Sequence, residues 1–321
     1  MGTTALSVLQ SSLGTLIGDS QGEYSSNYTG AINNASKEIS SALFIPLDNM
    51  DLITGNILPP FIWATTATLD FYTEPTGTLL KNTDGAYIWN GSSSAKLTAS
   101  GTDDTIYIDS DAYPRLLDLM DKTIDYKCWA YPVDAAADAF LTIYTVQKDG
   151  TAQTLNSTTT TYAGKKCLIE LEDQSINDDI EHIAFRMRVN TTLQNVYFDM
   201  PRATGMTVRE YLLPQDFQDG QLSSVGIQTS GYADDACDDL HPAAWDTVYD
   251  WEIVTEGVYK YLRLPAGYSN ERRIRLKGYR RLETLSDDSD TASIEGEQVN
   301  LLLSYAAYKL FEVESQEIQY T

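Results

Sequence analysis

The stretch from Phe61 to Pro201 limits the fold more than any other part of the chain. It consists of short runs in which apolar and polar residues alternate, separated by clusters of Gly, Asn, Asp and Thr, as in DTIYIDS, FLTIYTVQ and AFRMRVN. Alternation with a period of two places apolar side chains on one face of a strand, so Arg186 and Arg188 of the last run face away from the core. Short strands with turn signals between them predict an antiparallel β-sandwich or jelly roll of about 140 residues.

Helical spacing occurs at both ends of the chain. Apolar residues three and four positions apart predict a first helix from Leu6 to Ile17, a second with its apolar stripe from Ile32 to Leu43, and a last one from Val299 to Val313. Between the sandwich and the last helix, MTVREYLL predicts a short helix. The runs YDWEIVT, KYLRLPA and RRIRLKGYRR predict strands.

These patterns predict a multidomain α+β chain in which the sandwich is inserted into a helical scaffold. We expect residues 1–58 to form the N-terminal helical part of the scaffold and residues 59–203 to form the inserted sandwich. Residues 204–321 would supply a small β-sheet and the helix that complete the scaffold. Domain insertions are tolerated because the termini of a domain usually lie close together at its surface.

The chain is strongly acidic, with 46 Asp and Glu residues against 22 Lys and Arg residues and a formal net charge of −24. This balance argues against equilibrium binding of nucleic acid, which depends on neutralising phosphates. It fits a soluble surface, a saline habitat, or a surface past which DNA moves without being held. We expect no signal peptide, because the first residues lack a basic segment, and no membrane span, because no apolar run reaches about 20 residues.

Residues that usually carry catalysis or bind metals are scarce. The two histidines, His182 and His241, lie in no recognisable catalytic or cofactor-binding motif, and the three cysteines lack zinc-ligand spacing. Acidic loops at 234–240 and 286–290 offer oxygen ligands for calcium but lack the spacing of a calcium loop, so we interpret them as solvated turns. We therefore expect no enzymatic activity, no cofactor and no metal.

Three tryptophans of the predicted sandwich are candidate glycan contacts. Trp63, Trp89 and Trp129 would stack on sugar rings if they were exposed, as flat aromatic side chains do in carbohydrate-binding modules. The same residues would fill the core if they pointed inward. The sequence leaves both alternatives open.

One short strand concentrates positive charge within this acidic chain. In RRIRLKGYRR, residues 272–281, strand alternation places Ile274 and Leu276 on one face and basic side chains on the other. The basic positions form either an ordinary exposed face or a patch that contacts acidic surface on another copy or another protein, where arginine is a favoured cation. The candidate contact residues are Arg272, Arg273, Arg275, Lys277, Arg280 and Arg281.

An ordered set of features occupies residues 4–45 and 245–313. It begins with a helix, a polar link and a helix in LQSSLGTLIGDSQGEYSSNYTGAINNASKEIS, and continues with a basic strand of the form R-x-R-x-x-G-x-R-R, an acidic LSDD turn and a helix carrying YAAYKL. This set resembles the head-to-tail adaptor proteins, also called connector or neck proteins, of tailed bacterial and archaeal viruses. The resemblance covers about a third of the chain.

The resemblance implies a ring of about twelve subunits beneath a portal protein, at the head–tail junction of a virion. It implies further contacts to a tail or stopper protein, with the basic strand facing neighbouring subunits or the portal. DNA would pass through the ring without specific binding. The protein would be made in the host cytoplasm and found in the virion neck.

The inserted sandwich departs from the compact members of that family. Its end, NVYFDMPRAT, is similar to the last strand of carbohydrate-binding jelly rolls. Two other hypotheses follow, because a fold alone does not decide a function. One is a carbohydrate-binding, receptor-binding or decorating virion protein that acts through the sandwich. The other is a glycan-active enzyme with an attached binding module, which the scarcity of catalytic residues disfavours.

Overall fold

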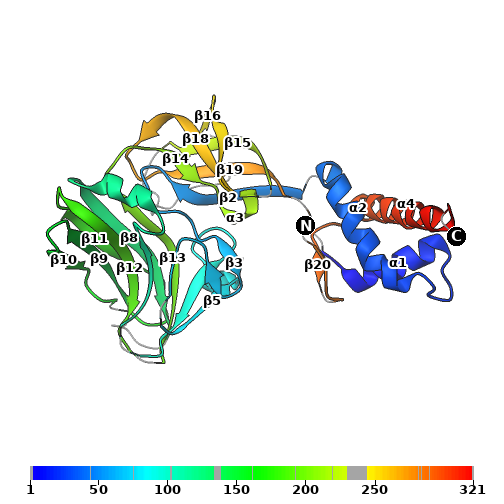
Figure 1. The fold of residues 1–321 in the computed structure, drawn as a ribbon, viewed down its shortest axis with the longest axis horizontal. Coiled ribbons are helices and arrows are strands. Elements are labelled where there is room, and N and C mark those ends of the chain that lie inside the picture. Colours follow the sequence, from blue (N-terminus) through cyan, green and yellow to red (C-terminus); the bar gives the residue numbers. More distant parts are fainter. Residues whose placement is uncertain are drawn as a thin grey trace. The chain divides into compact units, whose positions relative to one another are not determined.

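The computed structural model describes residues 3–43, 45–74, 76–101, 103–133, 139–160, 162–191, 193–218, 220–229, 244–280, 282, 284–288 and 290–319. It divides into two compact units, each made of more than one chain segment (Figure 1). The helical unit comprises Met1–Leu47, Asp219–Leu222 and Gly278–Thr321. The β unit comprises Asp48–Gln218 and Ser223–Lys277.

The helical unit is built from α1 (Leu6–Ile17), α2 (Tyr28–Leu43) and α4 (Glu297–Gln319), which correspond to the three helices predicted from apolar spacing. In this unit β1 (Thr4–Ala5) pairs with β20 (Thr291–Ala292), so the first residues of the chain lie beside the segment that precedes α4. Helix α1 ends where its apolar spacing ends. Gly18 takes a left-handed conformation there, at φ 74°, and its N–H caps the carbonyls of Gly14 and Thr15.

The apolar stripes of the three helices meet in one core. Lys309 of α4 pairs with Glu38 of α2 at 2.9 Å, and the Asn33 side chain both donates to and accepts from the backbone of Leu285. Helices with such narrow stripes depend on tertiary packing for stability. Fully buried side chains of this core include Leu6, Leu9, Leu13, Ile32, Leu302 and Ala306.

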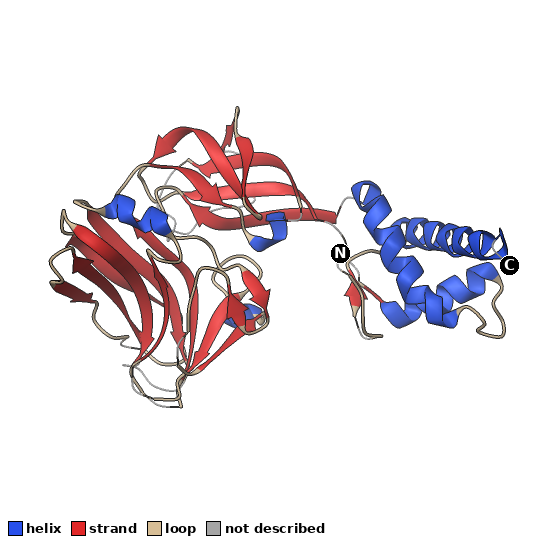
Figure 2. Cartoon of the chain, in the orientation of Figure 1, coloured by secondary structure: helices blue, strands red, loops and turns tan. Residues whose placement is uncertain are grey.

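The β unit contains the predicted antiparallel sandwich (Figure 2). Its strands are β5 (Thr78–Asn82), β6 (Ser94–Thr98), β7 (Asp104–Asp109), β8 (Thr123–Pro132), β9 (Ala139–Gln147), β10 (Ala152–Asn156), β11 (Cys167–Ser175), β12 (Ile180–Val189) and β13 (Asn195–Thr204). One sheet has the order β10-β9-β12-β7 and the other β11-β8-β13-β6-β5. The chain changes sheet from β6 to β7, from β7 to β8 and from β8 to β9, as in a jelly roll.

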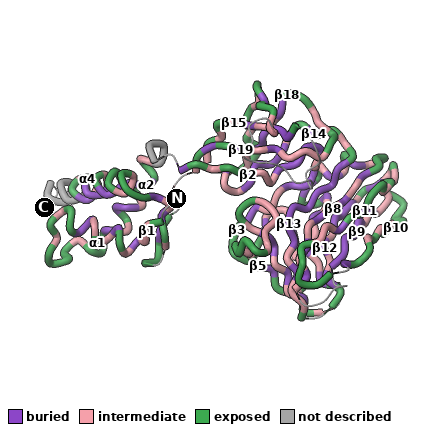
Figure 3. The backbone as a smooth tube through the Cα atoms, turned by 180° about the vertical axis from the view of Figure 1, so that it is seen from behind, coloured by how far each residue is buried: buried purple, intermediate pink, exposed green. Residues whose placement is uncertain are grey.

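Strand alternation decides which side chains enter the sandwich (Figure 3). In β12, Phe185 and Met187 are fully buried, whereas Arg186 and Arg188 are partly exposed, so the alternation predicted for AFRMRVN is confirmed. Tyr126 of β8 packs edge-on against Phe185, with ring centroids 5.0 Å apart. The two sheets therefore meet through aromatic as well as aliphatic contacts.

The remaining strands form smaller sheets. They are β2 (Ile45–Ile53), β14 (Val208–Leu212), β15 (Gln221–Gln228), β16 (Trp245–Val248), β17 (Glu252–Glu256), β18 (Tyr259–Tyr268) and β19 (Arg273–Arg280), with the short pair β3 (Trp63–Thr65) and β4 (Thr68–Leu69) and the short helix α3 (Gln215–Gln218). The sheet orders are β16-β15-β19-β2 and β14-β18-β17. Strands β14, β16, β17 and β18 belong to the β unit, and β2, β15 and β19 have residues in both units.

The prediction of a short helix in MTVREYLL is wrong, because residues 208–212 form β14. This strand pairs antiparallel with β18, with Tyr211 opposite Leu262, and both Tyr211 and Leu212 are buried. Cross-strand pairing and burial outweigh the local preference of this run for a helix. Within the described residues, no helix is both long and apolar enough to cross a membrane.

Candidate functional site

Two of the three candidate tryptophans lie against each other on the outer side of the sandwich. Trp129 belongs to β8, and Trp89 follows a single turn of 3-10 helix at Gly85–Tyr87. Their rings stack with centroids 3.7 Å apart and planes inclined by 14°. Both side chains are partly buried, and they pack beside Ile53 and Met200.

Tyrosines extend this aromatic surface. Tyr87 stacks on Tyr197 of β13 with centroids 4.0 Å apart and planes inclined by 3°, and Tyr131 of β8 meets Tyr87 edge-on at 4.9 Å. These tyrosines were not among the residues predicted from the sequence. Strand alternation was the available signal, since Tyr131 lies two positions after Trp129 and therefore shares its face.

A pocket of about 610 Å³ lies beside Trp129. We call it the Trp129 pocket. Its wall combines an aromatic ring with threonine hydroxyls, a lysine and two carboxylates, and the amine of Lys166 also lies 5.7 Å from the Trp89 ring. The lining residues are Trp129, Thr158, Thr159, Thr160, Tyr162, Lys166, Cys167, Leu168, Ile169, Glu170 and Glu172.

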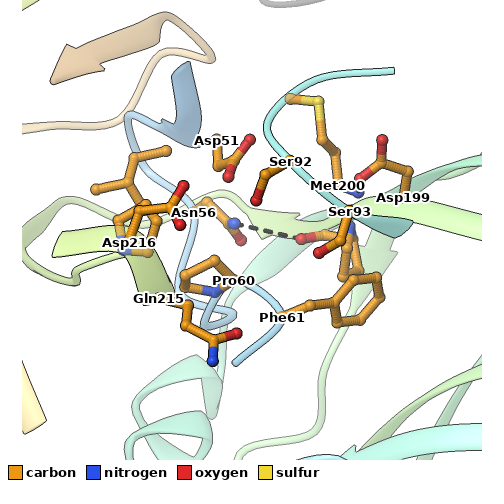
Figure 4. A pocket seen from close by; sticks show the side chains of 13 residues that line it. Asp51, Asn56, Pro60, Phe61, Ser92, Ser93, Asp199, Met200, Gln215 and Asp216 are labelled. Carbon is orange, nitrogen blue, oxygen red and sulfur yellow. Dashed lines mark hydrogen bonds between the residues drawn. The ribbon is translucent and has the colours of Figure 1, made fainter. Parts of the chain in front are cut away.

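A second, much smaller cavity is lined by three aspartates (Figure 4). Asp51 comes from β2, Asp199 from β13 and Asp216 from α3. The space inside it, about 30 Å³, has room for a water molecule. We call this the acid cavity. Among the described residues, no group of three or more His, Cys, Asp or Glu side chains has the arrangement of a metal site.

Both carboxylate oxygens of Asp199 accept hydrogen bonds from backbone N–H groups. Oδ2 accepts hydrogen bonds from the N–H groups of Trp89 at 2.6 Å and Asn90 at 3.2 Å, and Oδ1 accepts from the N–H of Met200 at 2.9 Å. Asp199 thus fixes the segment that carries Trp89.

Burial raises the pKa values of Asp199 and its neighbour Asp51. Desolvation raises the pKa of Asp199 to about 7, and the negative charge of Asp51 contributes to the rise. Desolvation also raises the pKa of Asp51 to about 6, although Asn49 donates to its Oδ2 at 2.8 Å. Asp51 Oδ1 is buried without a hydrogen-bond partner among the described residues. The pair therefore takes up protons above the pH at which exposed carboxyl groups do.

The other sequence candidates lie elsewhere. Trp63 is only 4% exposed, and its backbone exchanges hydrogen bonds with the Gln215 side chain, so it belongs to the core alternative and cannot stack on a sugar. His182 lies 3.8 Å from Asp111 at the surface of the sandwich. His241 and the 234–240 loop lie outside the described residues. In the other acidic loop, Asp290 accepts from the backbone N–H groups of Ser286 and Asp287, an ordinary turn arrangement.

The basic strand is β19, and its alternation is as predicted, with Ile274 and Leu276 fully buried. Its charges are partly engaged within the chain. The Nε of Arg275 donates to Asp48 at 2.8 Å and its guanidinium lies 5.3 Å from the Trp245 ring, while Arg280 donates to Ser293 at 2.8 Å. Among the other candidates Lys277 is exposed, Arg272 and Arg273 are partly buried, and Arg281 lies outside the described residues.

No protein-family model and no curated protein matches this chain. Solved structures that resemble part of it include the C-terminal family 22 carbohydrate binding module of Clostridium thermocellum Xyn10B, at 14% identity and a TM-score of 0.39, over 47% of this chain and 95% of that one. The CBM22-1 xylan-binding domain of Paenibacillus barcinonensis Xyn10C matches at 11% identity and 0.32, over 49% and 91%. The enzymatically active domain of tailspike protein 4 from bacteriophage CBA120 matches at 11% and 0.33, over 42% and 19%. Scores of this size establish no shared fold, so the sandwich assignment depends on the strand pairing described above.

Proposed function

We propose that the β unit binds carbohydrate at the Trp129 pocket and that this chain is a binding protein rather than an enzyme. The observation that carries the proposal is the composition of the pocket wall. Trp129 offers an apolar ring for the C–H face of a sugar, and Thr158, Thr159, Glu170 and Glu172 offer oxygens for its hydroxyl groups. The volume, about 610 Å³, lies within the range of roughly 300–1,000 Å³ that small-ligand sites occupy.

The charge of the chain narrows the ligand class. With a net charge of −24, the protein repels polyanions such as nucleic acids over long distances. Glu170 and Glu172 add negative charge to the pocket wall, and Lys127 pairs with both, at 3.3 Å and 2.9 Å. These features favour a neutral oligosaccharide.

A glycan array probed with the whole chain tests this proposal. We expect a restricted group of neutral oligosaccharides to bind, and the Trp129→Ala variant to lose that binding. Tyr144→Ala is the matched control, because Tyr144 is a partly exposed aromatic residue of β9, in the other sheet of the sandwich, and does not line the pocket. An array without hits, or equal binding by the Trp129→Ala variant, would contradict the proposal.

A second function is favoured by the helical unit. Helix α4 also carries apolar side chains that are exposed. They are seven and three positions apart, so they form a row along the helix: Leu301, Tyr308 and Phe311. Val8 and Leu16 of α1 are exposed as well, at 53% and 56%. Exposed apolar rows of this kind are typical of surfaces that pack against other helices.

We infer from this row, together with the resemblance to head-to-tail adaptors, that the helical unit assembles into a ring in a virion neck. The proposed partners are further copies of the chain, a portal protein, and a tail or stopper protein, with DNA passing unbound. The proposed site is the neck of a virion assembled in the host cytoplasm. The sandwich would then be an appendage that binds glycans.

The mass of the purified chain, alone and mixed with a portal protein, tests ring assembly. Native mass spectrometry should find a ring of about twelve copies, alone or on the portal. Phe311→Ser should reduce assembly and leave the monomer folded. A stable monomer with no affinity for the portal would contradict assembly and leave the glycan proposal untouched.

A further inference from the structure

The outer face of the four-stranded sheet carries a cation without a counter-ion among the described residues. Arg186 lies on β12, between β9 and β7, and its side chain is partly exposed. No ion pair or hydrogen bond joins its guanidinium group to any described residue. Other arginines of the chain do pair with carboxylates: Arg115, Arg188, Arg202, Arg263 and Arg275. In a chain with 46 acidic residues, an arginine left without such a pair is a candidate for binding a carboxylate of another molecule.

An aromatic ring fixes the position of this guanidinium group. The Cζ atom of Arg186 lies over the ring of Tyr144, 4.4 Å from the ring centroid. A contact with the face of a ring leaves the N–H groups at the edge of the guanidinium plane free to donate. Arg186 can therefore offer two parallel N–H groups to one carboxylate, the arrangement in which this pair is strongest.

The neighbouring charges favour an anion beside Arg186. Arg188 lies two positions further along the same face of β12, and its own partner is Asp103, at 2.9 Å. Burial and the positive charge of Arg188 lower the pKa of Arg186, although Asp109 and the nearby tyrosines oppose this effect. No ion pair joins Asp109 to Arg186. A bound carboxylate would supply the compensating charge that the described residues do not.

Two tyrosine hydroxyl groups accompany the guanidinium group. Tyr107 of β7 lies directly opposite Arg186, and Tyr144 of β9 lies diagonally across from it. Neither hydroxyl group makes a hydrogen bond to a described residue. Aromatic rings beside unpaired polar groups offer a sugar both an apolar surface for its C–H groups and partners for its hydroxyl groups.

The net charge of the chain limits the charge of the ligand. At −24, the chain repels polyanions over long distances. Within a Debye length, about 8 Å at physiological salt, the local charge of Arg186 acts on a ligand that has already arrived. A short glycan with one carboxylate meets both conditions, because it is weakly repelled at a distance and attracted at the site.

We propose that the outer face of β7, β9 and β12 is a second glycan site, in which Arg186 binds the carboxylate of an acidic sugar unit. It is separate from the Trp129 pocket, because Trp129 belongs to the other sheet. The inference goes beyond the proposed function and does not depend on it. Tyr144→Ala remains a control for the Trp129 pocket, because the ligand proposed there is neutral and Tyr144 does not line that pocket.

Binding of acidic oligosaccharides to the whole chain tests this inference. The probes are short oligosaccharides with one glucuronate, galacturonate or sialate unit, each compared with its own methyl ester, which keeps the sugar and removes the charge. We expect at least one free acid to bind about tenfold or more tightly than its ester at about 0.15 M salt. Raising the salt concentration to about 0.5 M should reduce this preference.

Three variants assign the preference to Arg186. Arg186→Gln removes the charge, so an acid and its ester should bind alike. Arg186→Lys keeps the charge but lacks the paired N–H groups, so it should retain only part of the preference. Arg263→Gln is the matched control, because Arg263 already pairs with Glu210 and Glu252, and it should leave the preference unchanged.

Each result decides for or against the site. Equal affinity of the parent chain for every acid and its ester would overturn the proposal, whether or not the variants fold. A preference that Arg186→Gln retains would also overturn it. Dimers of the parent chain that bind no acid and that Arg186→Gln dissociates would show instead that this face contacts a second copy. A chain that prefers the acids but binds no neutral oligosaccharide would support this site and contradict the proposed function.

Discussion

At the scale of single residues, Asp51 makes stability depend on pH. Its folded-state pKa of about 6 lies above the ordinary value of 3.8, because burial disfavours the charged form. A carboxyl group with a raised pKa contributes stability that is present below its unfolded pKa and is lost as the pH rises through the folded pKa. The free energy of unfolding should therefore fall between about pH 4 and about pH 7, where Asp51 and Asp199 lose their protons.

Asp51→Asn should reverse part of this loss. The amide oxygen can still accept from Asn49, and no charge is left to bury. We expect the variant to be more stable than the parent chain by roughly 1 kcal/mol at pH 8, with a smaller difference at pH 5. Urea denaturation at both pH values measures this, and equal stabilities at pH 8 would rule the account out.

Arg202 is the largest fully buried side chain of the described residues, and its Nε donates to Glu271 at 2.8 Å. Glu271 also accepts from the hydroxyl of Thr204 at 3.1 Å. Removing one partner of a buried ion pair leaves the other charge poorly compensated. Glu271→Ala should cost roughly 3 kcal/mol in denaturant melts, whereas Glu252→Ala, which breaks an exposed pair with Arg263, should cost much less.

At the scale of elements, the turn from β13 to β14 requires glycine. Gly205 has φ 131°, and a Cβ built there lies 2.4 Å from the Thr123 carbonyl oxygen. Gly205→Ala should therefore lower stability by roughly 3 kcal/mol or more. Gly150 also has positive φ, at 86°, but nothing lies within 4 Å of its Cβ, so Gly150→Ala should cost only about 1 kcal/mol. Equal thermal midpoints for the two variants would contradict this reasoning.

Elements whose own periodicity is strong could be predicted from the sequence, and those fixed by distant partners could not. Strand β12 alternates cleanly and α1 keeps helical spacing up to Gly18, so both were foreseen. Strand β14 was missed because its burial comes from pairing with β18. The stack of Trp89 on Trp129 was beyond reach for the same reason, since Asp199, 110 positions away from Trp89, determines where Trp89 lies.

At the scale of the whole molecule, each unit has its own core, so the units should melt separately. The helical core contains Leu6, Ile32 and Leu302 and draws all of its buried residues from the helical unit. Leu302→Ala should reduce the free energy of unfolding of the helical unit by roughly 3 kcal/mol. One calorimetric transition should therefore move to a lower temperature, and the glycan affinity should not change. Bound glycan should raise only the other transition. A single transition that both changes shift would show that the units unfold together.

Carbohydrate binding by the Trp129 pocket is the central claim, and calorimetric titration of the whole chain with the best oligosaccharide from the array tests it most directly. The account predicts saturable binding to one site at pH 8, about thirtyfold weaker in Trp129→Ala and unchanged in Tyr144→Ala. Absence of heat with any array ligand would contradict it, and so would a Trp129→Ala variant that binds as tightly as the parent chain.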